Sequence, residues 1–186
     1  MKPLPGDVVL DIGAYVGDTS LWFARRVAPD GFVYAFEPDK NNFSKLSHNI
    51  RLNKVTNILA FNITLSDAEG IANLSGGGEG ATLVSDTSEN AGGKTQVNTV
   101  DNFLKNNNVH KVDFIKMDVE GFEMNVLRGA VETIRDFQPK LAISVYHKGE
   151  DLSVIPQFLG TLSNNYKFYL RHCTPIWGNT VLYAAI

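Results

Sequence analysis

The segment spanning residues 8–18 constrains the fold of this chain more than any other. An apolar run ends at Asp11, and the two glycines Gly13 and Gly17 follow it. An amphipathic stretch begins at Thr19. This order predicts a buried strand, a tight glycine turn and a helix. Such a turn brings backbone N–H groups and a helix N-terminus close to a ligand, so we expect a binding site at the end of the first strand.

The spacing of the glycines narrows the choice of ligand. A dinucleotide fingerprint has glycines at its first, third and sixth positions, and the middle one lets the pyrophosphate touch the backbone. Counted from Gly13, the third position is Tyr15 and the sixth is Asp18. A tyrosine side chain and a carboxylate are poor neighbours for a diphosphate. The turn therefore favours a nucleoside ligand without phosphates, and it disfavours a nicotinamide-dependent oxidoreductase.

Short apolar runs alternate with helical patterns along most of the chain. We expect strands at Asp7–Ile12, Phe32–Phe36, Asn57–Asn62, Val112–Met117, Lys140–Tyr146, Tyr166–His172 and Thr180–Ala185. Apolar residues that recur every three to four positions predict helices at Thr19–Val27, Asn41–Asn53, Phe122–Asp136 and Ser153–Ser163. Strands that alternate with helices favour a mostly parallel sheet covered on both faces.

The last two expected strands are joined only by residues 173–179. A parallel crossover needs a dozen or more residues, so this short link predicts an antiparallel pair. The predicted fold class is therefore α/β: a doubly wound sheet that is mostly parallel and ends in a C-terminal antiparallel hairpin strand.

One segment interrupts the alternation. Residues 75–95 contain six glycines and little apolar content, and the flanking pieces Gly70–Leu74 and Thr95–Val100 are expected to pair as short strands. Loops of this length inside a compact domain are usually functional or disordered. Two interpretations stay open, a lid that faces the substrate and plain disorder. We expect a single domain over residues 1–186 with a Gly-rich insertion at about 70–100.

Composition and charge exclude several functional classes. The 186 residues carry a formal net charge of -3, and no apolar run approaches the length of a membrane span. The N-terminus has no apolar signal region, and Cys173 has no second cysteine to pair with. We therefore expect a cytoplasmic protein that binds neither nucleic acid nor membrane. A local basic patch is interpreted as the solvated face of two helices: Arg25, Arg26, Lys40, Lys45, Arg51 and Lys54.

Acidic residues follow the predicted strands, where ligands bind in open α/β sheets. Glu37 comes 24 residues after Gly13, close to the ~20-residue offset of ribose-binding acids. A carboxylate there can accept hydrogen bonds from both ribose hydroxyls. The alternative is a solvated residue before a helix that Pro38 begins, although Asp39 fits that description better. Asp11 either orders the glycine turn or faces a cationic end of the ligand.

Ser66 and Asp67 follow the third strand. Asp67 could reach the amino group of an adenine, but the sequence Ser-Asp-Ala-Glu-Gly is also an ordinary turn. Both interpretations stay open at this point.

Asp118 and Glu120 end the fourth strand, and His147 ends the fifth. His147 is a candidate general base because the pKa of histidine lies near neutrality, with a purely structural histidine as the alternative. The two acids either pair with Lys116 and Lys148, or stabilise the start of the next helix. Together with His147 they could also ligate a metal. Because Asp-x-Glu is a common pattern, we assign no metal ligands.

Three motifs in this order resemble class I S-adenosylmethionine-dependent methyltransferases, and more closely their FkbM family. The resemblance rests on Asp11–Ser20 (DIGAYVGDTS), Ala35–Pro38 (AFEP) and Phe114–Glu123 (FIKMDVEGFE), continued by Val126–Ala130. It covers nearly the whole chain. It implies a Rossmann-like methyltransferase sheet, S-adenosyl-L-methionine as cofactor, and mainly O-methylation of small molecules and sugars.

The resemblance also implies residue roles. Glu37 corresponds to the ribose acid, Asp67 to the adenine-side acid, and Asp118 faces the methionine end or the acceptor. His147, Asp118 and Glu120 are candidates for the base that an acceptor hydroxyl needs. The residues expected to bind the cofactor are Asp11, Gly13, Ala14, Tyr15, Gly17, Asp18, Thr19, Glu37, Pro38, Ser66, Asp67 and Asp118.

Related enzymes commonly carry N-terminal helices that close over the acceptor, whereas the first strand here starts near residue 7. We therefore expect the site to be closed by the Gly-rich loop or by a partner chain, as in a homo-oligomer, or the chain to be a trimmed catalytic core. The acceptor is expected to be a small molecule or sugar. A cofactor-binding module without catalysis is the rival hypothesis.

Overall fold

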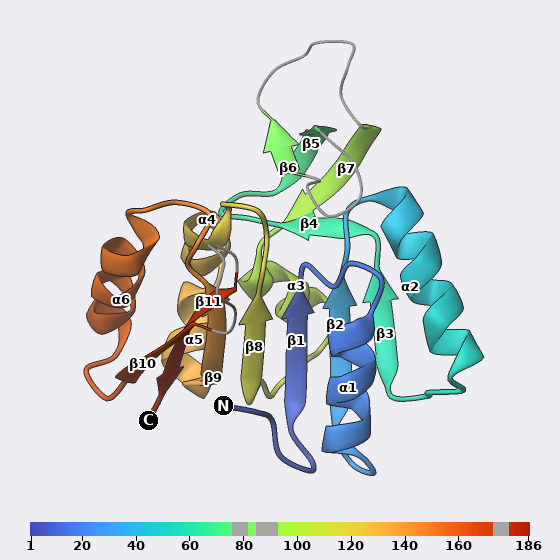
Figure 1. Cartoon of the computed structure of the whole chain (residues 1–186), viewed down its shortest axis with the longest axis horizontal. Helices are drawn as coiled ribbons and strands as arrows, with labels where there is room; N and C mark the ends of the chain where they lie inside the picture. Colours follow the sequence, from blue (N-terminus) through green and yellow to red (C-terminus); the bar gives the residue numbers. More distant parts are fainter. Residues whose placement is uncertain (76–81, 85–92, 173–178) are drawn as a thin grey trace.

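The computed structural model describes residues 1–75, 82–84, 93–172 and 179–186. Its main sheet has the strand order β10-β11-β9-β8-β1-β2-β3 (Figure 1). Five neighbouring strands run parallel, β11 is antiparallel to β9, and β10 is antiparallel to β11. The doubly wound, mostly parallel sheet with a C-terminal antiparallel pair is thus confirmed. The strands are β1 (Val8–Ile12), β2 (Phe32–Phe36), β3 (Ile58–Phe61), β8 (Phe114–Met117), β9 (Lys140–Ser144), β10 (Lys167–His172) and β11 (Thr180–Ala185).

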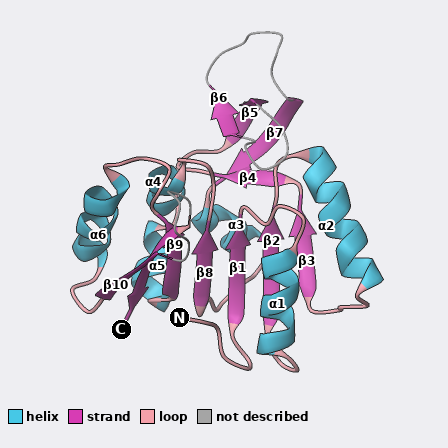
Figure 2. Ribbon diagram, in the orientation of Figure 1, coloured by secondary structure: helices cyan, strands magenta, loops and turns pink. Residues whose placement is uncertain are grey.

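Helices cover both faces of this sheet (Figure 2). Side chains alternate across a strand, so Val9 and Leu10 of β1 belong to different apolar clusters. Helices α1 (Asp18–Val27) and α2 (Lys40–Leu52) contribute to the cluster of Val9. The cluster of Leu10 receives side chains from α3 (Val100–Asn106), α4 (Glu123–Arg128), α5 (Val131–Phe137) and α6 (Asp151–Leu162). This two-sided burial explains why β1 is apolar at consecutive positions.

The helix expected at Phe122–Asp136 is wrong in its extent, because the structure has two helices there. They are α4 (Glu123–Arg128) and α5 (Val131–Phe137). Gly129 lies between them, at a position where a Cβ atom would collide with the carbonyl oxygen of Ser66. The apolar periodicity continues through the break because both helices face the same cluster.

Helix α3 (Val100–Asn106) holds the start of α5. The Asp101 carboxylate of α3 accepts hydrogen bonds from the backbone N–H groups of Glu132 (3.0 Å) and Thr133 (2.9 Å). Thr99 in turn caps α3. Sequence periodicity does not predict α3, because seven residues are too few to show a helical repeat.

A small sheet stands above the carboxyl ends of the main strands (Figure 1). Its strand order is β4-β7-β5-β6, with β4 (Ile63–Leu65), β5 (Gly70–Ser75), β6 (Thr82–Val84) and β7 (Gly93–Asn98). The antiparallel pairing of β5 with β7 confirms the two short strands expected around the Gly-rich segment. The choice between a lid and disorder falls on residues outside the described ranges. Within those ranges, no helix is both long and apolar enough to cross a membrane.

Candidate active site

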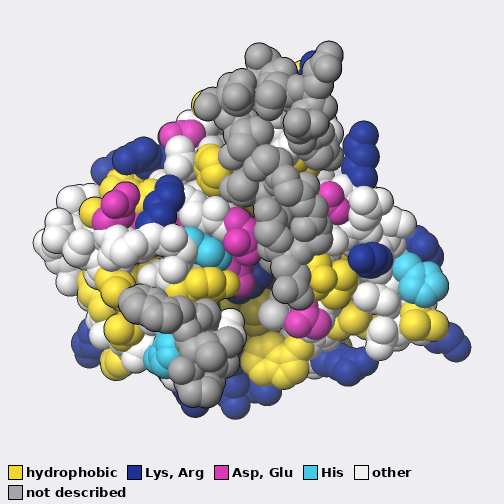
Figure 3. Space-filling view, turned by 45° about the horizontal axis from the view of Figure 1, so that its top comes forward, with side chains coloured by type: hydrophobic (Ala, Val, Ile, Leu, Met, Phe, Trp, Pro, Cys, Tyr) yellow, Lys and Arg dark blue, Asp and Glu magenta, His cyan; other side chains and the backbone are white. Residues whose placement is uncertain are grey.

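A cleft of about 510 Å³ lies at the carboxyl ends of β1, β2 and β8. Strand β1 pairs with β2 on one side and with β8 on the other, so the cleft lies where the strand order reverses. Acidic side chains gather in the hollow at this end of the molecule, with a histidine beside them (Figure 3). Nine of the residues expected from sequence line the cleft: Gly13, Ala14, Tyr15, Asp18, Thr19, Glu37, Pro38, Asp118 and Glu120.

The glycine turn is tied to the end of β2. The backbone N–H groups of Gly13 and Ala14 donate hydrogen bonds to the Phe36 carbonyl, at 3.1 and 2.9 Å. Gly13 has a φ of 80°, and a Cβ atom there would collide with the carbonyl oxygen of Asp118. Only glycine combines this conformation with so close an approach. The turn therefore fixes the spacing between β1, β2 and β8 at the floor of the cleft.

Asp11 lies beneath the turn and is fully buried. Its Oδ2 atom accepts hydrogen bonds from the hydroxyls of Thr19 (2.8 Å) and Ser20 (2.6 Å). Asp11 does not belong to the cleft lining that the structure describes. These contacts fit the first of the two roles that the sequence allowed, which is to order the turn and the start of α1.

Lys116 also lines the cleft, although no sequence motif identifies it as a site residue. Its Nζ atom lies 3.2 Å from Oδ1 of Asp11 and donates a 2.6 Å hydrogen bond to the carbonyl of Gly13. Pairing of Lys116 and Lys148 with the acids after β8 was one of two alternatives from the sequence. In the structure Lys116 pairs with Asp11, and Lys148 lies over the Phe122 ring. The available signal was one charge inside each of two apolar strands, which the parallel register places side by side.

Glu37 is only 5% exposed, at the end of β2. Its two carboxylate oxygens accept hydrogen bonds from the backbone N–H groups of Tyr15 (2.8 Å) and Asp39 (3.0 Å). Burial raises the pKa of Glu37 to about 7, although these backbone hydrogen bonds oppose the rise. Asp39 caps α2 by accepting a hydrogen bond from the Asn42 N–H. Glu37 is thus a fixed acceptor at the cleft wall.

Three further sequence candidates lie away from the cleft lining that the structure describes. Asp67 accepts hydrogen bonds from Asn125 of α4 (3.0 Å) and from Ser66 (3.1 Å). Gly17 precedes α1 with a φ of 91°, packed against Leu46. The cofactor roles of Ser66, Asp67 and Gly17 stay predictions. At this side of the cleft the lining comes from Thr64 and Leu65.

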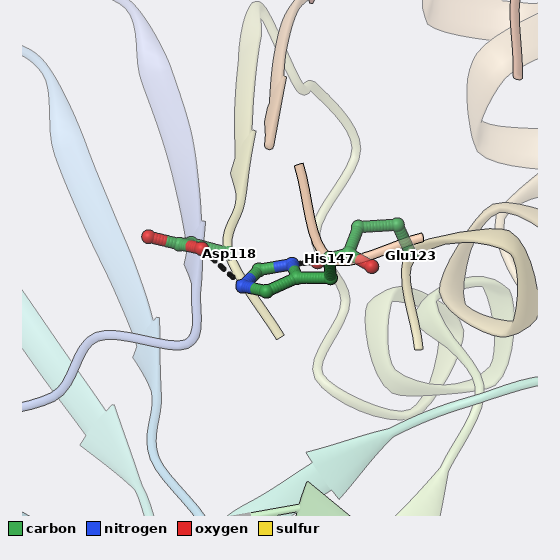
Figure 4. Close-up of side chains that lie close together, drawn as sticks. All are labelled: Asp118, Glu123 and His147. Atoms are coloured by element: carbon green, nitrogen blue, oxygen red, sulfur yellow. Dashed lines mark hydrogen bonds and ion pairs between the residues drawn. The ribbon is translucent and has the colours of Figure 1, made fainter. Parts of the chain in front are cut away.

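His147 lies between Asp118 and Glu123 behind the other wall of the cleft (Figure 4), and Glu120 is a third acid close to it. Its Nδ1 atom donates a 2.8 Å hydrogen bond to Glu123, and its Nε2 atom lies 3.6 Å from Asp118 and 3.5 Å from Glu120. Burial lowers the pKa of His147, but the hydrogen bond to Glu123 and the three negative charges outweigh it, so the pKa rises above its ordinary value. Glu123 is fully buried and was not predicted from the sequence as a site residue.

Tyr146 connects this cluster to the cleft, which it lines together with Asp118 and Glu120. Its hydroxyl donates a 3.2 Å hydrogen bond to Asp118. Burial and the nearby charge of Asp118 raise the pKa of Tyr146, so the hydroxyl stays protonated. His147 itself does not belong to the described lining. Asp118 and Glu120 are therefore the members of the cluster that a ligand in the cleft can touch.

Several proteins of known structure share the fold of this chain. A methyltransferase FkbM from Methylobacillus flagellatus KT has a similar structure, with a TM-score of 0.80 and 25% identity over 99% of this chain. This chain spans 44% of the length of that one. Aeropyrum pernix fibrillarin, solved with natively bound S-adenosyl-L-methionine, shares the fold at a TM-score of 0.58 and 16% identity, covering 98% of this chain and 67% of its own.

A SAM-dependent methyltransferase from Aquifex aeolicus also shares the fold, with a TM-score of 0.54 and 12% identity over 97% of this chain and 82% of its own. No curated protein matches the sequence. The fold and the cleft thus define a Rossmann-like methyltransferase domain. The family model of the methyltransferase FkbM domain matches residues 11–168, and the chain belongs to this family.

Proposed function

We propose that this chain binds S-adenosyl-L-methionine and transfers its methyl group to a hydroxyl of a small molecule or sugar. The observation that carries the proposal is the pairing of Glu37 with the glycine turn at one wall of the cleft. Family membership supports it. A formal net charge of -3 favours a small acceptor over a nucleic acid.

The lining of the cleft supports one orientation of the proposed cofactor. The ionised Glu37 carboxylate accepts the two ribose hydroxyls, and the turn beginning at Gly13 lies beside the methionine part. The apolar side chains of Ile63, Leu65 and Leu74 line the same cleft and offer a surface for the adenine. In this orientation Asp118 and Glu120, which line the same cleft, would lie on the side where the methyl group meets the acceptor.

The reaction is an in-line displacement. The acceptor oxygen forms a bond to the methyl carbon, the carbon–sulfur bond breaks, and its electron pair stays on the sulfur as a neutral thioether. Most of the acceleration comes from holding the reacting atoms about 3–3.5 Å apart. The hydroxyl proton passes to a base. Asp118 and Glu120 line the cleft and can accept it directly, whereas His147 acts through them.

Calorimetric titration of the protein with S-adenosyl-L-methionine and with its demethylated product tests the cofactor. We expect both to bind the native protein, and Glu37→Gln to weaken both by at least tenfold. Glu132→Gln, an exposed acid on α5, is the matched control and is expected to change neither. Binding of neither compound to the native protein would overturn the proposal.

A screen of hydroxylated small molecules and sugars, followed by mass spectrometry, tests the transfer. We expect one acceptor class to gain a methyl group, with stoichiometric formation of the demethylated cofactor. Cofactor binding without methyl loss across all acceptors would instead favour the binding module without catalysis.

A further inference from the structure

The Nε2 atom of His147 makes no hydrogen bond to any residue that the structure describes, although it is buried. The side chain is 10% exposed. The carboxylate oxygens of Asp118 and Glu120 face this nitrogen at 3.6 and 3.5 Å, which is too long for a hydrogen bond. Two acids thus approach one imidazole nitrogen next to the cleft, at distances longer than a hydrogen bond.

The other ring nitrogen of His147 is held firmly. The buried carboxylate of Glu123 accepts the Nδ1–H at 2.8 Å, and the same oxygen accepts the backbone N–H of Val119 at 3.1 Å. Proteins place a carboxylate behind a metal-ligating histidine in this way, because it fixes the tautomer and aims the free nitrogen. Glu123 therefore directs Nε2 toward Asp118 and Glu120.

The backbone brings these acids together from a short segment. Glu120 has a φ of 54° and Gly121 a φ of 91°, so the chain turns sharply after β8. This turn lets Asp118, Glu120 and Glu123 all approach His147, which follows the neighbouring strand β9. One oxygen each of Asp118 and Glu123 and a ring nitrogen of His147 lie within 4.8 Å of one another.

We propose that Asp118, Glu120 and His147 bind a divalent transition-metal ion, with Glu123 as the supporting carboxylate. Metal–ligand bonds of about 2.1 Å place adjacent ligand atoms about 3.0–3.4 Å apart. The observed 3.5 and 3.6 Å need to shorten by only a few tenths of an ångström. One imidazole with two carboxylates suits Zn²⁺ or Mn²⁺ better than Ca²⁺ or Mg²⁺, which prefer oxygen alone.

The ion lies where it can act on the acceptor, because two of its ligands line the cleft. This part of the inference rests on the proposed function, whereas binding of the ion does not. The bound ion coordinates the acceptor hydroxyl and lowers its pKa. With the ion bound, Asp118 and Glu120 are ligands and no longer serve as the base, so the proton passes to bulk water. The oxygen forms the bond to the methyl carbon, and the electron pair of the broken carbon–sulfur bond stays on sulfur.

Calorimetry on tag-free protein, dialysed against a chelator and then freed of it, tests the site with ZnCl₂ and MnCl₂ as probes. We expect one equivalent of Zn²⁺ or Mn²⁺ to bind the native protein, and MgCl₂ to bind more weakly. His147→Ala is expected to abolish this binding, and Glu123→Gln to weaken it about 10–100-fold. His48→Ala, an exposed histidine on α2, is the matched control and is expected to bind as the native protein does.

Asp118→Asn provides a second variant of nearly unchanged shape, and circular dichroism checks that each variant is folded. Absence of stoichiometric binding to the native protein would overturn the proposal in favour of a protonated imidazole held by the three acids. Equal binding by native and His147→Ala proteins would overturn it as adventitious binding. Cofactor titrations on the same samples separate this failure from failure of the proposed function.

Discussion

The two walls of the cleft are built differently. At the Glu37 wall, the carboxylate is held by backbone N–H groups at 2.8 and 3.0 Å, and the turn rests on Asp11 and Lys116 at comparably short distances. At the opposite wall, Asp118 and Glu120 approach His147 only to 3.6 and 3.5 Å. The first wall is thus held by short contacts, whereas the side chains of the second approach His147 at longer distances.

The largest effect is expected from Lys116→Met, which removes the cation beside the fully buried Asp11. Leaving one partner of a buried pair unpaired destabilises a protein by about 3–5 kcal/mol. Urea unfolding measures this loss. Lys111→Met is the matched control, because Lys111 is 58% exposed in its pair with Asp113 and is expected to contribute under about 1 kcal/mol. A loss for Lys116→Met no larger than the control would show that the Glu37 wall does not depend on this pair.

Gly13→Ala is expected to have the next largest effect, again on the free energy of unfolding. The added methyl would strike the Asp118 carbonyl, and alanine resists the φ of 80°, so the free energy of unfolding should fall by about 2–4 kcal/mol. Gly160→Ala in α6 meets no atom within 4 Å and is expected to gain about 0.5–1 kcal/mol. Thermal unfolding compares the two. If both variants unfold at the native temperature, the turn is not under the constraint described.

A pH effect of about tenfold is expected on cofactor binding. Because the pKa of Glu37 is about 7, its carboxylate is mostly protonated at pH 6 and mostly ionised at pH 8. The Kd for S-adenosyl-L-methionine should therefore rise about tenfold from pH 8 to pH 6. Glu37→Gln should remove this dependence, and a Kd that is equally pH-dependent in both proteins would assign it to another group.

The same group affects stability in the opposite direction. The folded pKa of about 7 exceeds the ordinary value of 4.5, so the folded state binds more protons between these values. Without ligand, this group's contribution to stability is present below pH 4.5 and is lost as the pH rises through 7. Glu37→Gln should flatten that part of the unfolding profile.

The smallest effect is expected from Asp67→Asn. Asp67 bonds to Asn125 and Ser66 and is not part of the described cleft lining, so the Kd for the cofactor should change less than about threefold. Calorimetry measures the Kd of Asp67→Asn and of Glu37→Gln for the cofactor, so that the two losses can be compared directly. A loss as large as that of Glu37→Gln would restore the adenine-side role that the sequence resemblance implies.

Much of the fold could be predicted because its signals are local. Apolar runs and helical repeats identify the main strands and most helices, and the short link before β11 identifies the antiparallel pair. The break at Gly129 could not be seen, since the contact that requires glycine there is with the carbonyl of Ser66, which is remote in sequence. Helix α3 was not predicted because it is too short to show a helical repeat of apolar residues.

The candidate site also contains residues that local sequence signals predict and residues that they do not. Gly13 and Glu37 end adjacent parallel strands, so their position in the sequence already places them at one edge. The contact between Glu123 and His147 depends on how two loops turn after β8 and β9, and the sequence does not fix this. Lys116 was recognisable only through the strand register that sets it opposite Asp11.

Cofactor affinity of Glu37→Gln and His147→Ala, measured side by side with the native protein at pH 8, tests the difference between the two walls most directly. We expect Glu37→Gln to lose at least tenfold in affinity for S-adenosyl-L-methionine and His147→Ala to stay within threefold of native. Equal losses in the two variants, or native affinity in Glu37→Gln, would contradict the assignment of the Glu37 wall to the cofactor.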